Sequence, residues 1–230
     1  MVLEIALTAL VLGGHSPTHT EVIGRSAFGR PIRATVLDNP STDRAVLVVG
    51  CIHGNEPAGL AVTRRLAHRR TWIAGADLWI LPDLNPDGHA RGTRQNGRGV
   101  DLNRNFPAGW RPLGRRWDPT YSGPRPLSEP ESRVARRLIL RIRPRLTIWY
   151  HQPQSLVRAV GADVPVARRY ARMVGLPFRQ LPVPPGAATR WQHARFPGTV
   201  AFVVELAPGR LSVRQAALHA RAVLRLARRP

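Results

Sequence analysis

The residues in this chain best suited to chemistry are two histidines and one glutamate. His53 and Glu56 lie close together in the string His53-Gly54-Asn55-Glu56, and His151 follows much later in the chain. Two imidazoles and one carboxylate form the ligand set of a catalytic zinc site, which keeps one further position open for water. The pattern therefore predicts that His53, Glu56 and His151 bind a single metal ion.

Glu205 is a candidate proton carrier. It lies inside the apolar string Phe-Val-Val-Glu-Leu at 202–206. A carboxylate in such a strand is costly to bury unless it is paired or functional. Burial would raise its pKa, which suits a general base that takes a proton from water. The alternative interpretation is a structural ion pair with one of the many arginines.

Two arginines are singled out by their surroundings. Arg94 lies in Thr-Arg-Gln-Asn at 93–96, and Arg104 follows Asn103 in Asp-Leu-Asn-Arg-Asn-Phe at 101–106. A guanidinium can hold a carboxylate through two parallel hydrogen bonds, and it can stabilise an oxyanion as charge develops. These two arginines are therefore candidate substrate or transition-state contacts.

Apolar strand-like runs alternate with helical patterns, which predicts a single three-layer α/β/α domain with a mixed central sheet. A capping box at Ser128-Glu129-Pro130-Glu131 is expected to open one helix. Two segments rich in Gly and Pro are expected to be long functional loops. The expected strands are 44–50, 77–81, 145–150 and 199–206, the expected helices 57–69, 128–142, 162–174 and 212–228, and the expected loops 85–118 and 181–197.

Polar side chains follow four of the expected strands. His53, Asn85, His151 and Glu205 all lie at or near the carboxyl end of a strand. Open α/β sheets place their binding sites at that edge. We therefore expect these side chains to meet in one site.

The composition limits the possible partners. The chain has 230 residues, of which 43% are hydrophobic, and a net charge of +21. All of its 35 Lys and Arg residues are Arg, which indicates either a polyanionic partner or the codon bias of a GC-rich genome. The arginines are spread along the chain and no nucleic-acid-binding module is visible, so no specific nucleic-acid partner is expected.

The termini and the single cysteine add little to the functional interpretation. Residues 1–20 are expected to be a signal peptide or an N-terminal extension, although an ordinary first strand is an equal alternative for 5–12, and 21–230 are expected to be the catalytic domain. The compartment stays open between the cell envelope or exterior and the cytoplasm. No apolar run is long enough to cross a bilayer. Cys51 is alone, so it is expected to be a small buried residue rather than part of a disulfide.

Several strings together resemble the M14 family of zinc metallocarboxypeptidases, which have the carboxypeptidase A-like fold. The resemblance covers most of the chain between Ile23 and Glu205. The strings that carry it are Ile-Gly-Arg-Ser at 23–26, Gly-Arg-Pro-Ile at 29–32, Asn-Pro-Asp-Gly at 85–88, Thr-Arg-Gln-Asn at 93–96, Val-Asp-Leu-Asn-Arg-Asn-Phe-Pro at 100–107, Tyr-Ser-Gly-Pro at 121–124 and Ser-Glu-Pro-Glu at 128–131.

The resemblance implies a role for each matching residue. It implies one Zn²⁺ per chain on the ligands named above, with Glu205 as general base and then general acid. It implies that Arg94 polarises the scissile carbonyl and holds the oxyanion. It also implies that Asn103 and Arg104 grip the terminal carboxylate of the substrate.

The chain is most similar to the murein peptide amidase branch, which cleaves the γ-D-glutamyl–diaminopimelate bond of peptidoglycan peptides. The implied molecule is a monomer acting on a peptide or muropeptide with a free carboxylate. The mobile tyrosine of digestive carboxypeptidases has no counterpart, because Thr189-Arg190-Trp191 occupies roughly its place. Arg190 is instead a candidate contact for an acidic substrate group, or a surface arginine.

Two other functions stay open at this point. One is an N-acyl amino acid deacylase of the succinylglutamate desuccinylase/aspartoacylase type, which shares His-Gly-Asn-Glu and Asp-Leu-Asn-Arg. The other is a non-catalytic protein on the same fold that binds an anionic polymer through its arginines.

Overall fold

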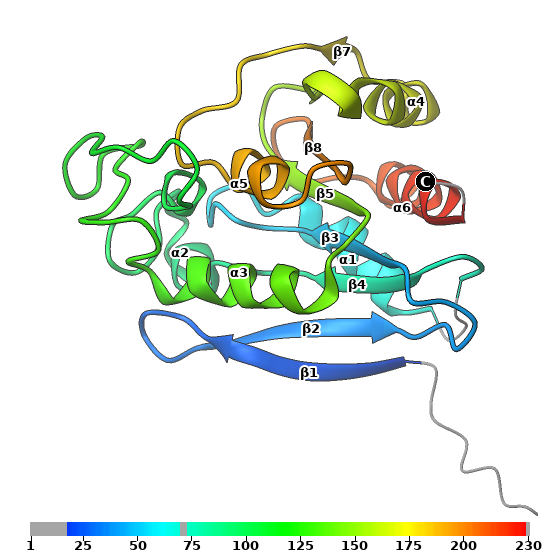
Figure 1. Ribbon diagram of the computed structural model, residues 1–230, viewed down its shortest axis with the longest axis horizontal. Coiled ribbons are helices and arrows are strands. Elements are labelled where there is room, and N and C mark those ends of the chain that lie inside the picture. The colour runs from blue at the N-terminus through cyan, green and yellow to red at the C-terminus, as the bar shows by residue number, and fades with distance from the viewer. Residues whose placement is uncertain (1–17, 70–72, 229–230) are drawn as a thin grey trace, which may run out of the picture.

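An eight-stranded mixed sheet organises the computed structural model, which describes residues 18–69 and 73–228 (Figure 1). Its strand order is β1-β2-β4-β3-β5-β8-β6-β7. The strands are β1 (Thr18–Arg25), β2 (Pro31–Leu37), β3 (Ala45–Val49), β4 (Asp77–Leu81), β5 (Leu146–His151), β6 (Leu156–Arg158), β7 (Phe178–Arg179) and β8 (Val200–Glu205).

Helices cover both faces of the sheet. Successive residues of the central strands point to opposite sides, so each central strand contributes apolar side chains to both faces. Val46 and Val48 of β3 belong to a core with α1, α4 and α6, whereas Leu47 and Val49 belong to a core with α3 and α5. The predicted three-layer α/β/α architecture with a mixed sheet is confirmed. The helices are α1 (Gly59–Ala67), α2 (Pro86–Arg91), α3 (Pro130–Ile142), α4 (Val164–Val174), α5 (Ala188–Arg195) and α6 (Val213–Arg228), with short 3₁₀ turns η1 (Leu102–Arg104) and η2 (Gly161–Asp163).

The three central strands β3, β5 and β8 run parallel, with β5 in the middle. Their residues are buried on both faces, apart from the half-buried first residue of β8. Because the strands are parallel, their carboxyl ends lie at one edge of the sheet. The register pairs His151 at the end of β5 with Glu205 at the end of β8.

The two segments predicted as long loops are partly helical. Segment 85–118 contains α2 and η1, and segment 181–197 contains α5. The side chain of Asn85 caps α2 by accepting from the Gly88 N–H, and Gly92 ends it in a left-handed conformation. Helices this short carry too few turns to show a periodic pattern in the sequence, which is why the prediction was wrong there.

The predicted capping box does not form. Helix α3 begins after Glu129, which makes no side-chain capping bond. The Ser128 hydroxyl donates to the Glu129 carboxylate, and Glu131 accepts from the Ala27 N–H at 2.8 Å. The Ser128 hydroxyl also accepts from the Asn105 side chain at 2.9 Å, so tertiary contacts hold both side chains away from their capping positions.

At its N-terminal end the sheet is longer than the sequence patterns indicated. Strands β1 and β2 form an antiparallel hairpin at the sheet edge and were not predicted. Because β1 starts at Thr18, residues 18–20 of the predicted N-terminal extension belong to the sheet. The apolar segment 5–12 lies outside the described residues. In the described part of the chain, no helix has the length and apolar character that a membrane span requires.

The turn that follows β3 packs tightly against α2 at Gly54. A methyl group added there would lie 1.9 Å from the carbonyl carbon of Gly88 and 2.1 Å from the nitrogen of His89. Both are backbone atoms, so neither can rotate away.

We expect Gly54→Ala to lower the free energy of unfolding by about 1–3 kcal/mol, the usual cost of overpacking. The exposed Ser41→Ala serves as the control, with an expected change within about 0.5 kcal/mol. Urea titration followed by tryptophan fluorescence measures both. Equal midpoints for Gly54→Ala and the unmodified protein would contradict the tight packing.

Candidate metal centre

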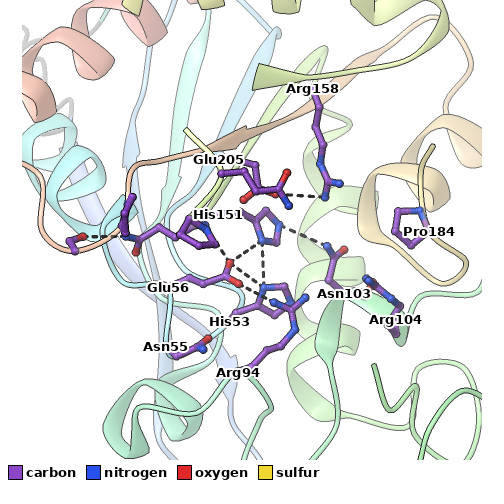
Figure 2. A pocket seen from close by; sticks show the side chains of 15 residues that line it. His53, Asn55, Glu56, Arg94, Asn103, Arg104, His151, Arg158, Pro184 and Glu205 are labelled. Atoms are coloured by element: carbon purple, nitrogen blue, oxygen red, sulfur yellow. Dashed lines mark hydrogen bonds and ion pairs between the residues drawn. The ribbon is translucent and has the colours of Figure 1, made fainter. Parts of the chain in front are cut away.

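The three predicted metal ligands meet at one point (Figure 2). Nδ1 of His53 lies 2.9 Å from Oε2 of Glu56 and 3.1 Å from Nδ1 of His151. The same oxygen of Glu56 lies 2.9 Å from Nδ1 of His151. All three residues are buried, and their ligand atoms lie within 4.8 Å of one another. The structure therefore brings together residues that are distant in sequence.

Two neighbouring strand ends deliver these ligands. His53 and Glu56 lie in the turn between β3 and α1, where the Glu56 N–H donates to the His53 carbonyl at 3.0 Å. His151 is the last residue of β5, which pairs with β3. The backbone N–H of Gln152 donates to Oε2 of Glu56 at 3.2 Å, so the main chain also fixes the carboxylate.

Asp101 determines which ring nitrogen of His53 carries the proton. Nε2 of His53 lies 2.9 Å from Oδ1 of Asp101, a buried carboxylate. A carboxylate in this position holds the Nε2 proton and leaves the Nδ1 lone pair free to bind a metal. Asp101 also accepts from the Asn103 N–H at 2.9 Å, which fixes its own orientation.

The charges of the cluster favour the binding of a cation. Burial lowers the pKa of His53, but the carboxylates of Asp101 and Glu56 outweigh burial and raise it. Burial lowers the pKa of His151 to about 4, which keeps this imidazole neutral at pH 7. The carboxylates of the cluster therefore favour a cation at the point where two imidazole nitrogens and a carboxylate oxygen face one another. This donor set fits zinc.

Glu205 lies next to this cluster, at the end of β8 opposite His151. It is only 3% exposed, and its Oε2 atom has no hydrogen-bond partner among the described residues. Burial raises its pKa, although the nearby Arg158 guanidinium acts in the opposite direction. The ion-pair interpretation is partly met, because Arg158 Nη2 lies 3.5 Å from Oε1 of Glu205. The other oxygen remains available to carry a proton.

Arg94 links the ligand Glu56 to the supporting Asp101. Its Nη1 donates to Oε1 of Glu56 at 2.7 Å, and its Nε donates to Oδ2 of Asp101 at 3.2 Å. The side chain is 26% exposed and lines the cavity above the cluster. It is therefore anchored at one end and accessible to a substrate at the other.

Asn103 and Arg104 lie in the turn η1 that follows Asp101. Oδ1 of Asn103 accepts from the Ala188 N–H at 3.0 Å, which ties this turn to α5. Nη1 of Arg104 donates to the Asn103 carbonyl at 2.8 Å. Burial lowers the pKa of Arg104, whose side chain is 14% exposed. The guanidinium is thus held partly buried at the cavity wall.

All but two of the predicted site residues line a single cavity of about 500 Å³. Asn85 does not reach it, because its side chain caps α2 and donates to the Ile52 carbonyl at 3.1 Å. Arg190 on α5 is exposed and donates to the Val183 carbonyl at 3.2 Å. Its contact with substrate stays a prediction. No tyrosine is among the lining residues in the described part of the chain. The predicted ligands, base and arginines that line the cavity are His53, Glu56, Arg94, Asn103, Arg104, His151 and Glu205.

Three further residues at this site were not predicted from the sequence. They are Asp101, which holds His53, and Gln152 and Arg158, which line the cavity. Asp101 could have been found from its place in the string 101–106. Gln152 and Arg158 follow His151 closely, but nothing in their own sequence pattern marks them.

The other motif residues secure the long segment around the site. Asn96 donates to the carboxylates of Glu129 and Glu131 at 2.8 and 3.0 Å. Asn105 donates to the Ser122 carbonyl at 2.8 Å and to the Ser128 hydroxyl at 2.9 Å. These buried contacts explain why Asn, Ser and Glu recur in the motifs without lining the cavity.

Comparison with known proteins places this geometry in a family. A family model described as zinc carboxypeptidase matches residues 10–160. Murein peptide amidase A of Escherichia coli (strain K12) is 33% identical over 155 residues, which span 63% of this chain and 63% of that protein. The alignment therefore covers somewhat less than two thirds of that relative's length.

Solved structures agree with this placement. The murein-tripeptide amidase of Escherichia coli O157 has 27% sequence identity and a TM-score of 0.73, with 94% of both chains covered. A succinylglutamate desuccinylase from Silicibacter has 20% identity and a TM-score of 0.67, over 92% of this chain and 67% of that one, and shares the fold alone. The resemblance found in the sequence is confirmed: the chain belongs to the zinc carboxypeptidase family.

Proposed function

We propose that this chain is a zinc-dependent amidase that hydrolyses an amide bond next to a free carboxylate. Its substrate would be a peptidoglycan-derived peptide of the γ-D-glutamyl–diaminopimelate type. The observation that carries the proposal is the meeting of a two-histidine, one-carboxylate cluster with Glu205 at the shared edge of β5 and β8. The murein peptide amidases among the relatives support the substrate class.

One zinc ion would be held by His53, Glu56 and His151. When bound, zinc supplies a Lewis acid that makes water more acidic and the amide carbonyl more electrophilic near neutral pH. The chain contributes the orientation of the ligands, since Asp101 fixes His53 and the Gln152 N–H fixes Glu56.

Glu205 would carry the proton through the reaction. It removes a proton from the attacking water, whose oxygen forms a bond to the carbonyl carbon. The carbon–nitrogen bond then breaks, and Glu205 returns the proton to the leaving nitrogen, giving a carboxylic acid and an amine. A buried carboxyl with a raised pKa suits both the base step and the acid step.

The arginines would place the substrate and its developing charge. Arg94, anchored on Glu56 and Asp101, would donate to the carbonyl oxygen as it becomes negative. Arg104 and Asn103 would bind the free carboxylate beside the cleaved bond, since a partly buried guanidinium gains most from pairing with an anion.

Zinc should stabilise the folded chain, because a ligand that binds only the native state raises its stability by mass action. At a zinc concentration 100-fold above the dissociation constant, we expect a gain of about 2.7 kcal/mol. Differential scanning calorimetry with and without zinc measures it. His151→Ala should abolish the gain, whereas His19→Ala, an exposed histidine on β1, should retain it. A gain that survives His151→Ala would contradict the ligand set.

Glu205→Gln should lower kcat by about 10²–10⁴-fold, because glutamine keeps the shape but cannot accept a proton. Zinc content, measured by atomic absorption, should stay at the level of the unmodified protein. The matched control is Glu21→Gln on the edge strand β1, where normal turnover is expected. Near-normal turnover in Glu205→Gln would rule out the assigned base.

Arg104→Ala should raise KM for substrates with a free carboxylate by about 10- to 100-fold, the value of a hydrogen bond to a charged group. The comparison is with the same peptide carrying a carboxamide in place of that carboxylate, for which the variant should lose little. An equal loss on both peptides would mean that Arg104 does not read the carboxylate. Acyl-glutamate and acyl-aspartate, assayed in parallel, test the deacylase alternative.

A further inference from the structure

One cationic side chain in the cavity, that of Arg158, has no role in the proposed reaction. Arg158 is the last residue of β6, which runs antiparallel to β8. Its side chain reaches into the cavity and is 20% exposed. Figure 2 shows Arg158, Asn103 and Arg104 on one side of His151, with Asn55 on the other side.

The charge of Arg158 is incompletely balanced. Among the described residues it forms one ion pair, with Glu205 at 3.5 Å. This distance is longer than that of a strong charge-assisted hydrogen bond, about 2.7–2.9 Å. The positive charge of Arg158 also acts on the nearby Arg104. The two partly buried guanidinium groups repel each other, and an anion bound to each would offset this repulsion.

The surroundings of Arg158 favour a substrate side chain that is aliphatic along its length. Arg158 and Asn103 line both the main cavity and a small adjoining recess. Apolar side chains such as Val160, Leu181 and Val203 line the recess, and no carboxylate does in the described part of the chain. The recess holds only about 20 Å³, so an aliphatic chain would lie in the main cavity beside this wall and present its acidic end to the guanidinium.

We propose that Arg158 binds a second carboxylate on the residue released by hydrolysis. The inference rests on the proposed function and narrows it: Arg104 and Asn103 hold the carboxylate next to the cleaved bond, and Arg158 selects a leaving residue that carries another carboxylate at the end of its side chain. Diaminopimelate has this chemistry. Lysine is its closest counterpart, since it lacks only that second carboxylate.

The matched substrates are therefore L-Ala-γ-D-Glu-meso-diaminopimelate and L-Ala-γ-D-Glu-L-Lys. The zinc-loaded protein should cleave the first with a kcat/KM higher by about 10- to 100-fold, mainly through KM. Arg158→Gln should remove most of this preference; because Arg158 also contacts Glu205, any change in turnover affects both peptides, and the ratio of their kcat/KM values is the measure. Arg158→Glu should reverse the preference, because the new carboxylate attracts the lysine amine and repels the acid.

Arg179→Gln is the control variant. Arg179 is paired with Arg158 across β6 and β7, but it is exposed and lies outside the cavity lining. It should keep the preference of the unmodified protein. If Arg158 only supports Glu205, Arg158→Gln will lower kcat equally on both peptides and leave the ratio unchanged. That result would overturn the proposal.

Calorimetry separates this inference from the reaction itself. Free meso-diaminopimelate and free L-lysine are titrated into the zinc-loaded protein and into Arg158→Gln. Tighter binding of meso-diaminopimelate that is lost in Arg158→Gln supports the inference even if neither peptide is cleaved, in which case the proposed reaction alone fails. Equal affinity for the two amino acids would overturn the inference whatever the activity.

Discussion

The parallel alignment of β3, β5 and β8 is the constraint on which the site depends. Parallel strands end at the same edge of the sheet. Because β5 lies between β3 and β8, the residues at the ends of these strands lie close together. The register fixes the partners further by pairing His151 with Glu205. A shift of one residue would turn either side chain to the opposite face. The buried cores on both faces hold that register.

Charge then decides how the converging side chains behave. Asp101 is the shared partner of His53, Arg94 and Arg104. Burial raises the pKa of this carboxylate, but the contact with His53 and the charges of the two arginines outweigh burial and lower it. Arg94 in turn holds Glu56. The candidate ligands His53 and Glu56 are thus oriented by Asp101 and Arg94, as is usual for residues that bind a metal. Glu205 is left outside this network apart from its long contact with Arg158, which keeps one of its oxygens free.

The segment between α2 and α3 shows how a long connection can form a rigid wall. It places Arg94, Asn103 and Arg104 in the cavity lining. The buried side-chain amides of Asn96 and Asn105 hold this segment in place through hydrogen bonds. The tight packing of Gly54 against α2 joins this wall to the turn that carries His53 and Glu56. Segments that provide site residues therefore also pack against one another.

The sequence by itself determined the alternation of strands and helices, and it named the candidate ligands and the candidate base, because apolar runs and residue chemistry are local properties. It also determined the family, through the strings at 85–107. Tertiary structure decided what depends on contacts between distant segments. Ser128, which accepts from Asn105, and Glu131, which accepts from Ala27, left their expected capping roles for such contacts, and α5 formed in a segment too short to show periodicity. Arg158 lies at the cavity only because β6 returns antiparallel to β8, which no local pattern in the chain reveals.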